Sequence, residues 1–224
     1  MKHFTAAALA LCLMTAQFAH AQNVSGCGAL ENHYGPYDYR KEKGRRLNIV
    51  EGAHFTPAVE ALIRGSSGAF AGDDLNYTLL TSPNHHRALL AMVRLADRAK
   101  SSKPPHMQYT VDCFFDRAVR FQPDDTVVRA LYGRYLNRQG RTAEAMQQLK
   151  AAVIFAKDNP LSHYNLGLVF MELKAYDEAL AQAHTAIALG MPPGALVDQL
   201  KAQRRWQEAA RAPSAAASAA SAAP

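Results

Sequence analysis

A repeat of 34 residues in the second half of this 224-residue chain most strongly constrains how it can fold. Five residue pairs at this separation keep their size or type: Gly133 and Gly167, Leu136 and Phe170, Glu144 and Glu178, Ala145 and Ala179, Ala152 and Ala186. Small residues at such positions let two antiparallel helices approach to ~8–10 Å, and the larger apolar residues between them recur at helical spacing. The period therefore predicts stacked helical hairpins, with tight turns at Gly140 and Lys174.

A degenerate copy of the repeat precedes these two. One further step of 34 residues assigns Phe115 and Ala118 to its second helix and Pro123 to that helix's end. The first helix is expected over 83–100, and the proline-containing linker 101–106 separates it from the second. The expected helix N-caps are Ser82, followed by a proline at the first helical position, Asp124 and Thr142.

These patterns predict an all-α protein, a solenoid of about three helical hairpins with a capping helix and an irregular N-terminal cap. The cap should contain one short helix, which begins at Thr56-Pro57 and ends at Gly65. The expected segments are a signal peptide (1–21), the N-terminal cap (22–81), a degenerate repeat (82–123), two regular repeats (124–158 and 159–191), a C-terminal capping helix (192–210) and an Ala/Ser/Pro tail (211–224).

The first residues are typical of a secretory signal peptide. Lys2 precedes an apolar run over 5–16, and Ala19-His20-Ala21 provides small residues for cleavage near Ala21. The run is shorter than the ~20 apolar residues that cross a membrane, and no later run reaches that length. We expect a periplasmic or secreted protein with no transmembrane segment in the mature chain.

Removal of the leader would take away Cys12 and leave Cys27 and Cys113. In an oxidising compartment an even number of cysteines favours one disulfide bond between them, and the alternative is two buried free thiols. A second alternative is a lipoprotein, because the segment 24–27 (Val-Ser-Gly-Cys) resembles a lipobox that would acylate Cys27. Four residues, 20–23, separate this box from the apolar run, whereas a lipobox normally follows the run directly.

The formal net charge of +6 would favour nucleic acid as a partner in a cytosolic protein. Outside the inner membrane, the same charge fits anionic lipid, cell-wall polymer or an acidic protein surface better, or simply a solvated basic surface. We therefore expect no nucleic-acid partner.

Residues 83–206 resemble tetratricopeptide repeat (TPR) proteins, most clearly over the two regular repeats. Four motifs also resemble a group of exported proteobacterial TPR proteins: 35–39 (Gly-Pro-Tyr-Asp-Tyr), 54–57 (His-Phe-Thr-Pro), 83–89 (Pro-Asn-His-His-Arg-Ala-Leu) and 164–168 (Tyr-Asn-Leu-Gly-Leu). The resemblance implies protein binding in a concave groove that the first helix of each repeat lines. The groove residues that it implies are His85, Met92, Arg134, Asn137, Tyr164, Leu168 and Met171. The alternative is that these residues pack against the N-terminal segment.

No recognisable catalytic motif or cofactor motif occurs in the sequence, which argues against an enzyme and against a cofactor. The main rival is a metal- or ligand-binding, possibly catalytic, N-terminal segment. In it His85 and His86, with His33 and His54, suggest a metal, and an enzyme would use this segment together with Asp38, Asp73 and Asp74. His85 and His86 are adjacent, so on a helix they would point ~100° apart, and no ligand spacing completes the set. We expect no metal, and the favoured function is an adaptor or assembly factor that binds another protein or peptide in the cell envelope.

Overall fold

The computed structural model describes residues 26–209, which form α-helices and no β-strand. The expected signal peptide (1–21) and tail (211–224) lie outside this range. In chain order the helices are α1 (Tyr39–Glu42), α2 (Leu47–His54), α3 (Pro57–Glu60), α4 (Ala71–Thr81), α5 (His86–Ala99), α6 (Val111–Phe121), α7 (Thr126–Arg138), α8 (Thr142–Ala156), α9 (Pro160–Glu172), α10 (Tyr176–Ala188) and α11 (Ala195–Ala202).

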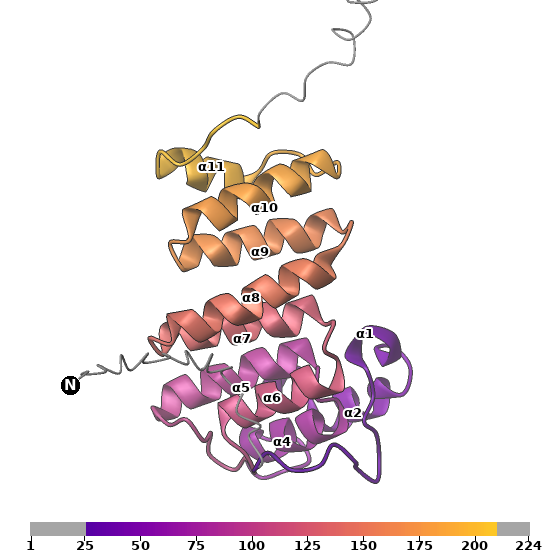
Figure 1. Ribbon diagram of the computed structural model, residues 1–224. Helices are drawn as coiled ribbons and strands as arrows, with labels where there is room; N and C mark the ends of the chain where they lie inside the picture. Colours follow the sequence, from indigo (N-terminus) through magenta and orange to yellow (C-terminus); the bar gives the residue numbers. More distant parts are fainter. Residues whose placement is uncertain (1–25, 210–224) are drawn as a thin grey trace, which may run out of the picture.

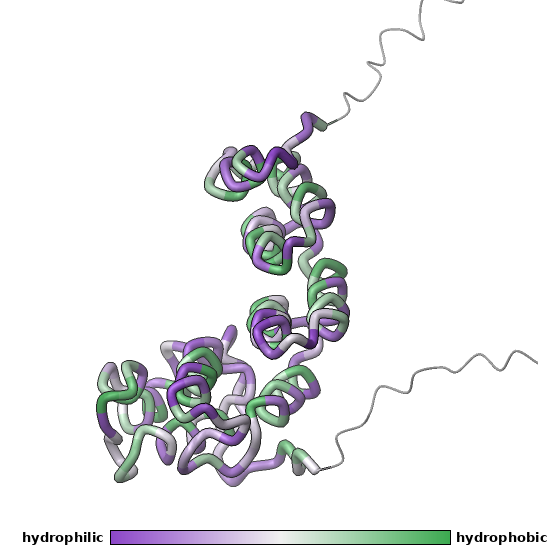
Figure 2. The backbone as a smooth tube through the Cα atoms, turned by 90° about the vertical axis from the view of Figure 1, so that its left-hand side faces the viewer, coloured by the Kyte–Doolittle hydropathy of each residue, from purple (hydrophilic) through white to green (hydrophobic). Residues whose placement is uncertain are grey.

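The helices stack as a TPR-like solenoid of helical hairpins, which confirms the predicted fold class. The pairs α7/α8 and α9/α10 pack along their lengths, and α11 covers the last pair (Figure 1). Seen nearly end-on, the helix pairs follow an arc, with the bulkier N-terminal part at one end (Figure 2). The hairpin turns are where they were predicted, since Gly140 and Lys174 both have positive φ, at 76° and 57°.

The two glycines of the 34-residue repeat lie where side chains of neighbouring helices approach the backbone. A Cβ atom at Gly133 would lie 3.0 Å from Leu149 of α8, and one at Gly167 would overlap Leu196 of α11. Leu149 and Leu196 are both buried. The repeated glycine therefore lets a leucine from a neighbouring helix fill the space that a larger residue would occupy.

The N-terminal cap is more helical than expected, because α1, α2 and α4 accompany the predicted short helix. The predicted helix, α3, begins after Thr56 as expected but ends at Glu60, and the chain then turns at Leu62, where φ is 58°. The additional helices are short or weakly amphipathic, and they are held by tertiary contacts. Tyr39 of α1 and Val50 of α2, for example, are buried in one small apolar cluster.

Helix α5 begins at His86, three residues later than predicted, and Ser82 is not its N-cap. Residues 82–85 form a buried turn, and the His85 ring accepts the capping hydrogen bond from the backbone N–H of Ala88 at 3.1 Å. A connection of the same length recurs 40 residues later. Helix α4 ends at Thr81 and α6 at Phe121, and in each case the next helix begins five residues further on. The first repeat is thus offset by 40 residues, not 34, because the linker between α5 and α6 is long.

Three helix ends also differ from the expected positions. The N-cap of α7 is Asp125 rather than Asp124, and it accepts hydrogen bonds from two backbone N–H groups of the helix. Thr142 is the first residue of α8, and Arg141 precedes it without a side-chain cap. The capping helix α11 ends at Ala202, and a left-handed residue, Arg204, then turns the chain so that Trp206 lies edge-on against His184 of α10.

Candidate protein-binding groove

The first helices of the three repeats, α5, α7 and α9, present corresponding positions on one side of the stack. Counted from the observed helix starts, the second residues are Arg87, Val127 and Leu161, the fifth Leu90, Ala130 and Tyr164, the ninth Arg94, Arg134 and Leu168, and the thirteenth Arg98, Arg138 and Glu172. Three apolar members of this set are unusually exposed: Leu90 at 40%, Val127 at 42% and Leu161 at 55%. We call the surface formed by these twelve residues the inner face.

A pocket of about 260 Å³ lies on this face between α7 and α9. Its apolar lining includes Val127, Ala130 and Leu168, and Arg134 and Glu172 stand at its edge. A smaller pocket of about 80 Å³ between α5 and α7 shares Leu131, Arg134 and Glu172 with the first. The two pockets are therefore parts of one groove that runs across the three helices.

Two exposed ion pairs bridge the helices along the groove. Arg134 of α7 lies 2.8 Å from Glu172 of α9, and Arg138 of α7 lies 3.3 Å from Asp97 of α5. Exposed pairs of this kind contribute little to stability, typically 0–1 kcal/mol. Their charged groups can therefore exchange partners with a ligand at low cost.

Of the seven predicted groove residues, only Arg134 and Leu168 line this groove. His85 and Met92 are completely buried, which contradicts their predicted role. The helix was expected to begin too early, and the two residues assigned to the groove lie two positions before Arg87 and Arg94, which are both exposed. Pro83 and Pro123 each lie three residues before a helix and are 40 residues apart. This separation was the sequence signal for the correct register.

The N-terminal cap covers the buried part of α5. The His85 ring packs 4.2 Å from the Tyr39 ring and 4.7 Å from the Phe55 ring, and its Nε2 lies 3.1 Å from Glu51. Because Nδ1 accepts from Ala88, Nε2 must carry the proton and donate to Glu51. The alternative interpretation, that implied groove residues pack against the protein's own N-terminal segment, is therefore correct for the first repeat.

The remaining three predicted residues have other surroundings. Asn137 accepts a hydrogen bond from Thr142 across the hairpin turn. Tyr164 is partly buried, with its hydroxyl near Gly194 at the start of α11. Met171 lines a separate recess between α9 and α11. None of the three reaches the groove between α7 and α9.

Three of the four histidines of the rival metal site, His54, His85 and His86, form hydrogen bonds between segments, and His33 is exposed. His86 lies 2.8 Å from Asp125, and His54 lies 2.8 Å from Asp74. Asp74 also accepts from the backbone N–H groups of residues 66–68, and these bonds outweigh burial and lower its pKa. Within residues 26–209 no three His, Cys, Asp or Glu side chains come close enough to hold a metal ion.

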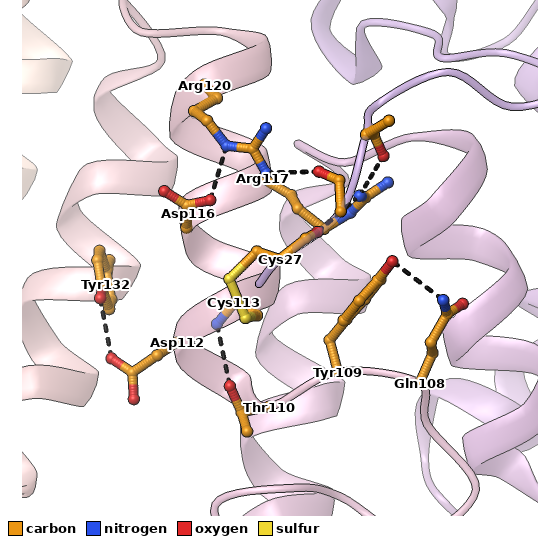
Figure 3. The surroundings of a disulfide bond; sticks show 12 residues. Cys27, Gln108, Tyr109, Thr110, Asp112, Cys113, Asp116, Arg117, Arg120 and Tyr132 are labelled. Atoms are coloured by element: carbon orange, nitrogen blue, oxygen red, sulfur yellow. Dashed lines mark hydrogen bonds and ion pairs between the residues drawn. A yellow bond between two sulfur atoms is a disulfide. The ribbon is translucent and has the colours of Figure 1, made fainter. Parts of the chain in front are cut away.

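The predicted disulfide bond is present between Cys27 and Cys113, with a Cα–Cα distance of 5.1 Å (Figure 3). Two arginines of α6 reinforce this attachment: Arg117 donates to the carbonyl oxygens of Cys27 and Ala29, and Arg120 donates to that of Gly28 at 3.1 Å. The start of the described chain is thereby fixed to α6. A bonded Cys27 sulfur is not free to be acylated, which contradicts the lipoprotein alternative at this residue.

No helix within residues 26–209 combines the length and hydrophobicity that a membrane span requires. Comparison with protein families matched the TPR repeat model over residues 133–174, which include the end of α7, all of α8 and α9, and the turns after them. Comparison with curated proteins and with solved structures returned no match. The matched repeat and the stacked hairpins together support a TPR protein, and TPR scaffolds are typically non-catalytic.

Proposed function

We propose that the protein is exported to the bacterial periplasm and acts there as a non-catalytic adaptor, which binds a segment of another envelope protein in the groove across α5, α7 and α9. The observation that supports this function best is the exposure of Leu90, Val127 and Leu161 beside one continuous groove. Apolar side chains that converge on a groove with a charged edge are typical of peptide-binding surfaces.

The groove is open in the isolated chain over the second and third repeats. The pocket between α7 and α9 is lined by residues of those two helices, and no residue of the cap lines it. A partner segment therefore needs no displacement of the cap to reach this pocket. Its apolar side chains would remove Val127 and Leu161 from water, which favours binding by roughly 25 cal/mol per Å² of apolar surface.

Site-specific photocrosslinking in intact cells tests the groove. A photoreactive amino acid would replace Leu161 or Leu90, and the matched control position is Ile154 on α8, which is 74% exposed and outside the groove. We expect a discrete crosslinked partner from Leu161 and Leu90 and none from Ile154. Equal crosslinking from Ile154, or none from either groove position, would contradict the proposed binding site.

Mass spectrometry of the protein purified from the envelope fraction tests export. We expect a mature chain that begins at Gln22 and is two hydrogens lighter than its reduced form, because of the Cys27–Cys113 bond. A chain that retains residues 1–21, or one found only in the cytoplasmic fraction, would contradict the proposed location.

A further inference from the structure

The charge of the inner face is graded along the stack. Helix α5 contributes Arg87, Arg94 and Arg98, α7 contributes Arg134 and Arg138, and the corresponding positions of α9 hold two leucines and Glu172. Arg94 and Arg134 are both the ninth residue of their helices, so they occupy equivalent positions on adjacent repeats. The inner face is thus basic on α5 and α7 and mostly apolar on α9.

The arginines exceed the carboxylates that pair with them. Asp97, Glu172 and Glu60 pair with Arg138, Arg134 and Arg87, respectively. Arg94 and Arg98 instead donate to the backbone carbonyl oxygens of Glu60 and Leu62, at 3.1 and 3.2 Å. A ligand with negative charge would therefore gain more from this end of the groove than a neutral or basic ligand.

The arginines of α5 contact a segment of the protein's own N-terminal cap. The segment around α3 buries Phe55 and Val59 in the core cluster that includes α5, and the Glu60 carboxylate accepts from Arg87 Nε at 2.9 Å. The hydrogen bond from Arg87 lowers the pKa of Glu60. The arginine row of α5 thus already binds a short segment that combines apolar side chains with an acidic one.

From this charge gradient and this internal example, and relying on the proposed function, we infer that the groove takes an acidic amphipathic segment of the partner protein. One apolar side chain enters the pocket between α7 and α9, and carboxylates of the same segment lie over Arg134, Arg138 and Arg94. The direction of the segment follows from the gradient, with its acidic end towards the cap.

The stacking distance sets the spacing within such a segment. Packed helices lie ~8–10 Å apart, so the pocket between α7 and α9 and the Arg94 side chain of α5 are separated by one and a half steps, ~12–15 Å. An extended segment covers this distance in about four or five residues, and a helical one in about eight to ten. The spacing between the apolar anchor and the farthest carboxylate therefore reports the conformation of the bound segment.

A random twelve-residue peptide library on phage, selected against the oxidised chain 22–224, provides the probe. We expect enriched peptides with a Leu, Phe or Met anchor and at least two Asp or Glu residues on one side of it. Their affinity should fall at least tenfold for Arg94→Glu/Arg134→Glu, and also on raising the salt concentration from 0.05 to 0.5 M, because exposed charges are screened. The variant Arg94→Gln/Arg134→Gln should show a smaller loss in the same direction and avoids a like-charge contact with Glu172.

The matched control is Arg45→Glu/Arg64→Glu, which changes the net charge equally at exposed residues outside the groove. Enriched peptides that are basic or uncharged, yet compete with crosslinking at Leu161, would overturn the inference of an acidic segment but would still support the groove as the binding site. Acidic peptides that lose affinity equally with the control variant would also overturn it. Absence of both peptide binding and crosslinking would overturn the proposed function itself.

Discussion

The side-chain amide of Asn84 donates a hydrogen bond of 2.9 Å to Asp125, the residue that caps α7. The same amide donates to Asp38 at 2.7 Å, and its oxygen accepts from the backbone N–H of Tyr39 at 3.0 Å. Asn84 is completely buried, and it connects the start of α1 to the start of the second repeat. This one side chain therefore joins the cap to the solenoid.

Replacement of Asn84 by Ala should destabilise the protein by about 2–4 kcal/mol, because the buried carboxylates of Asp38 and Asp125 each lose one donor and the backbone N–H of Tyr39 loses its acceptor. Urea unfolding followed by circular dichroism measures the change. The control is Asn48→Ala, at an exposed asparagine of α2, which we expect to change stability by less than about 0.5 kcal/mol. A loss of under 1 kcal/mol for Asn84→Ala would show that the amide is not the main connection.

Reduction of the Cys27–Cys113 bond should lower the free energy of unfolding by about 2–5 kcal/mol, since it closes a loop between residues 86 positions apart. Thermal unfolding with and without a reductant measures this effect. The double variant Cys27→Ser/Cys113→Ser should resemble the reduced protein and no longer respond to the reductant. An unchanged melting temperature in reductant would show that Arg117 and Arg120 suffice to hold the N-terminal segment.

Stability should decrease as the pH falls from 6.5 towards 5, because burial lowers the pKa of His85 to about 3. The unfolded chain, with a histidine pKa near 6.5, then binds a proton that the folded chain does not, so acid favours unfolding. His85 is expected to lower the free energy of unfolding by about 2 kcal/mol at pH 5 relative to neutral pH. The pKa values of Asp74 and Asp125 are also lowered, by hydrogen bonds that outweigh their burial, so both carboxylates stay ionised in this window.

The variant His85→Asn keeps a side-chain acceptor for the α5 N-cap and removes the titrating group. Its free energy of unfolding should change less between pH 6.5 and 5 than that of the unmodified protein. His33→Asn, at an exposed histidine, should retain the original dependence on pH. Parallel curves for all three proteins would rule out His85 as the source of the acid sensitivity.

Gly167→Ala should destabilise the protein by about 1–3 kcal/mol, although alanine favours helix more than glycine does, because the new methyl group overlaps Leu196 of α11. Gly52→Ala in α2 is the matched control, since no atom lies within 4 Å of its Cβ position. That substitution should be neutral or stabilise by up to about 1 kcal/mol. If the overlap is the cause, adding Leu196→Ala should produce a further loss smaller than Leu196→Ala produces alone.

The regular repeats could be predicted from the sequence because each position there has one dominant requirement. Gly133 and Gly167 must be small, Gly140 and Lys174 must allow a left-handed turn, and the period of 34 connects them. The pairing of Cys27 with Cys113 followed from there being one pair available. These features depend on local geometry or on counting, and they need no knowledge of distant contacts.

The cap and the register of α5 could not be predicted in the same way. The helices α1 and α2 depend on partners far along the chain, such as Asn84 for Tyr39 and Asp74 for His54. A proline before α5 favoured a helix start at that proline, whereas tertiary hydrogen bonds make residues 82–85 a buried turn. An error of two residues in register placed the buried His85 and Met92 in the predicted groove, where the structure has the exposed Arg87 and Arg94.

Within residues 26–209, two large apolar clusters meet within α8, where Ala145 belongs to the first and Leu149 to the second. The disulfide bond and the cap restrain only the first cluster, so the outermost helices, α9 to α11, should open in sub-global fluctuations while the rest stays folded. Amide hydrogens of α9 should then exchange with solvent before those of α6. A ligand in the pocket between α7 and α9 touches both cooperative units, so its binding would slow exchange across the whole C-terminal unit rather than at the contact site alone.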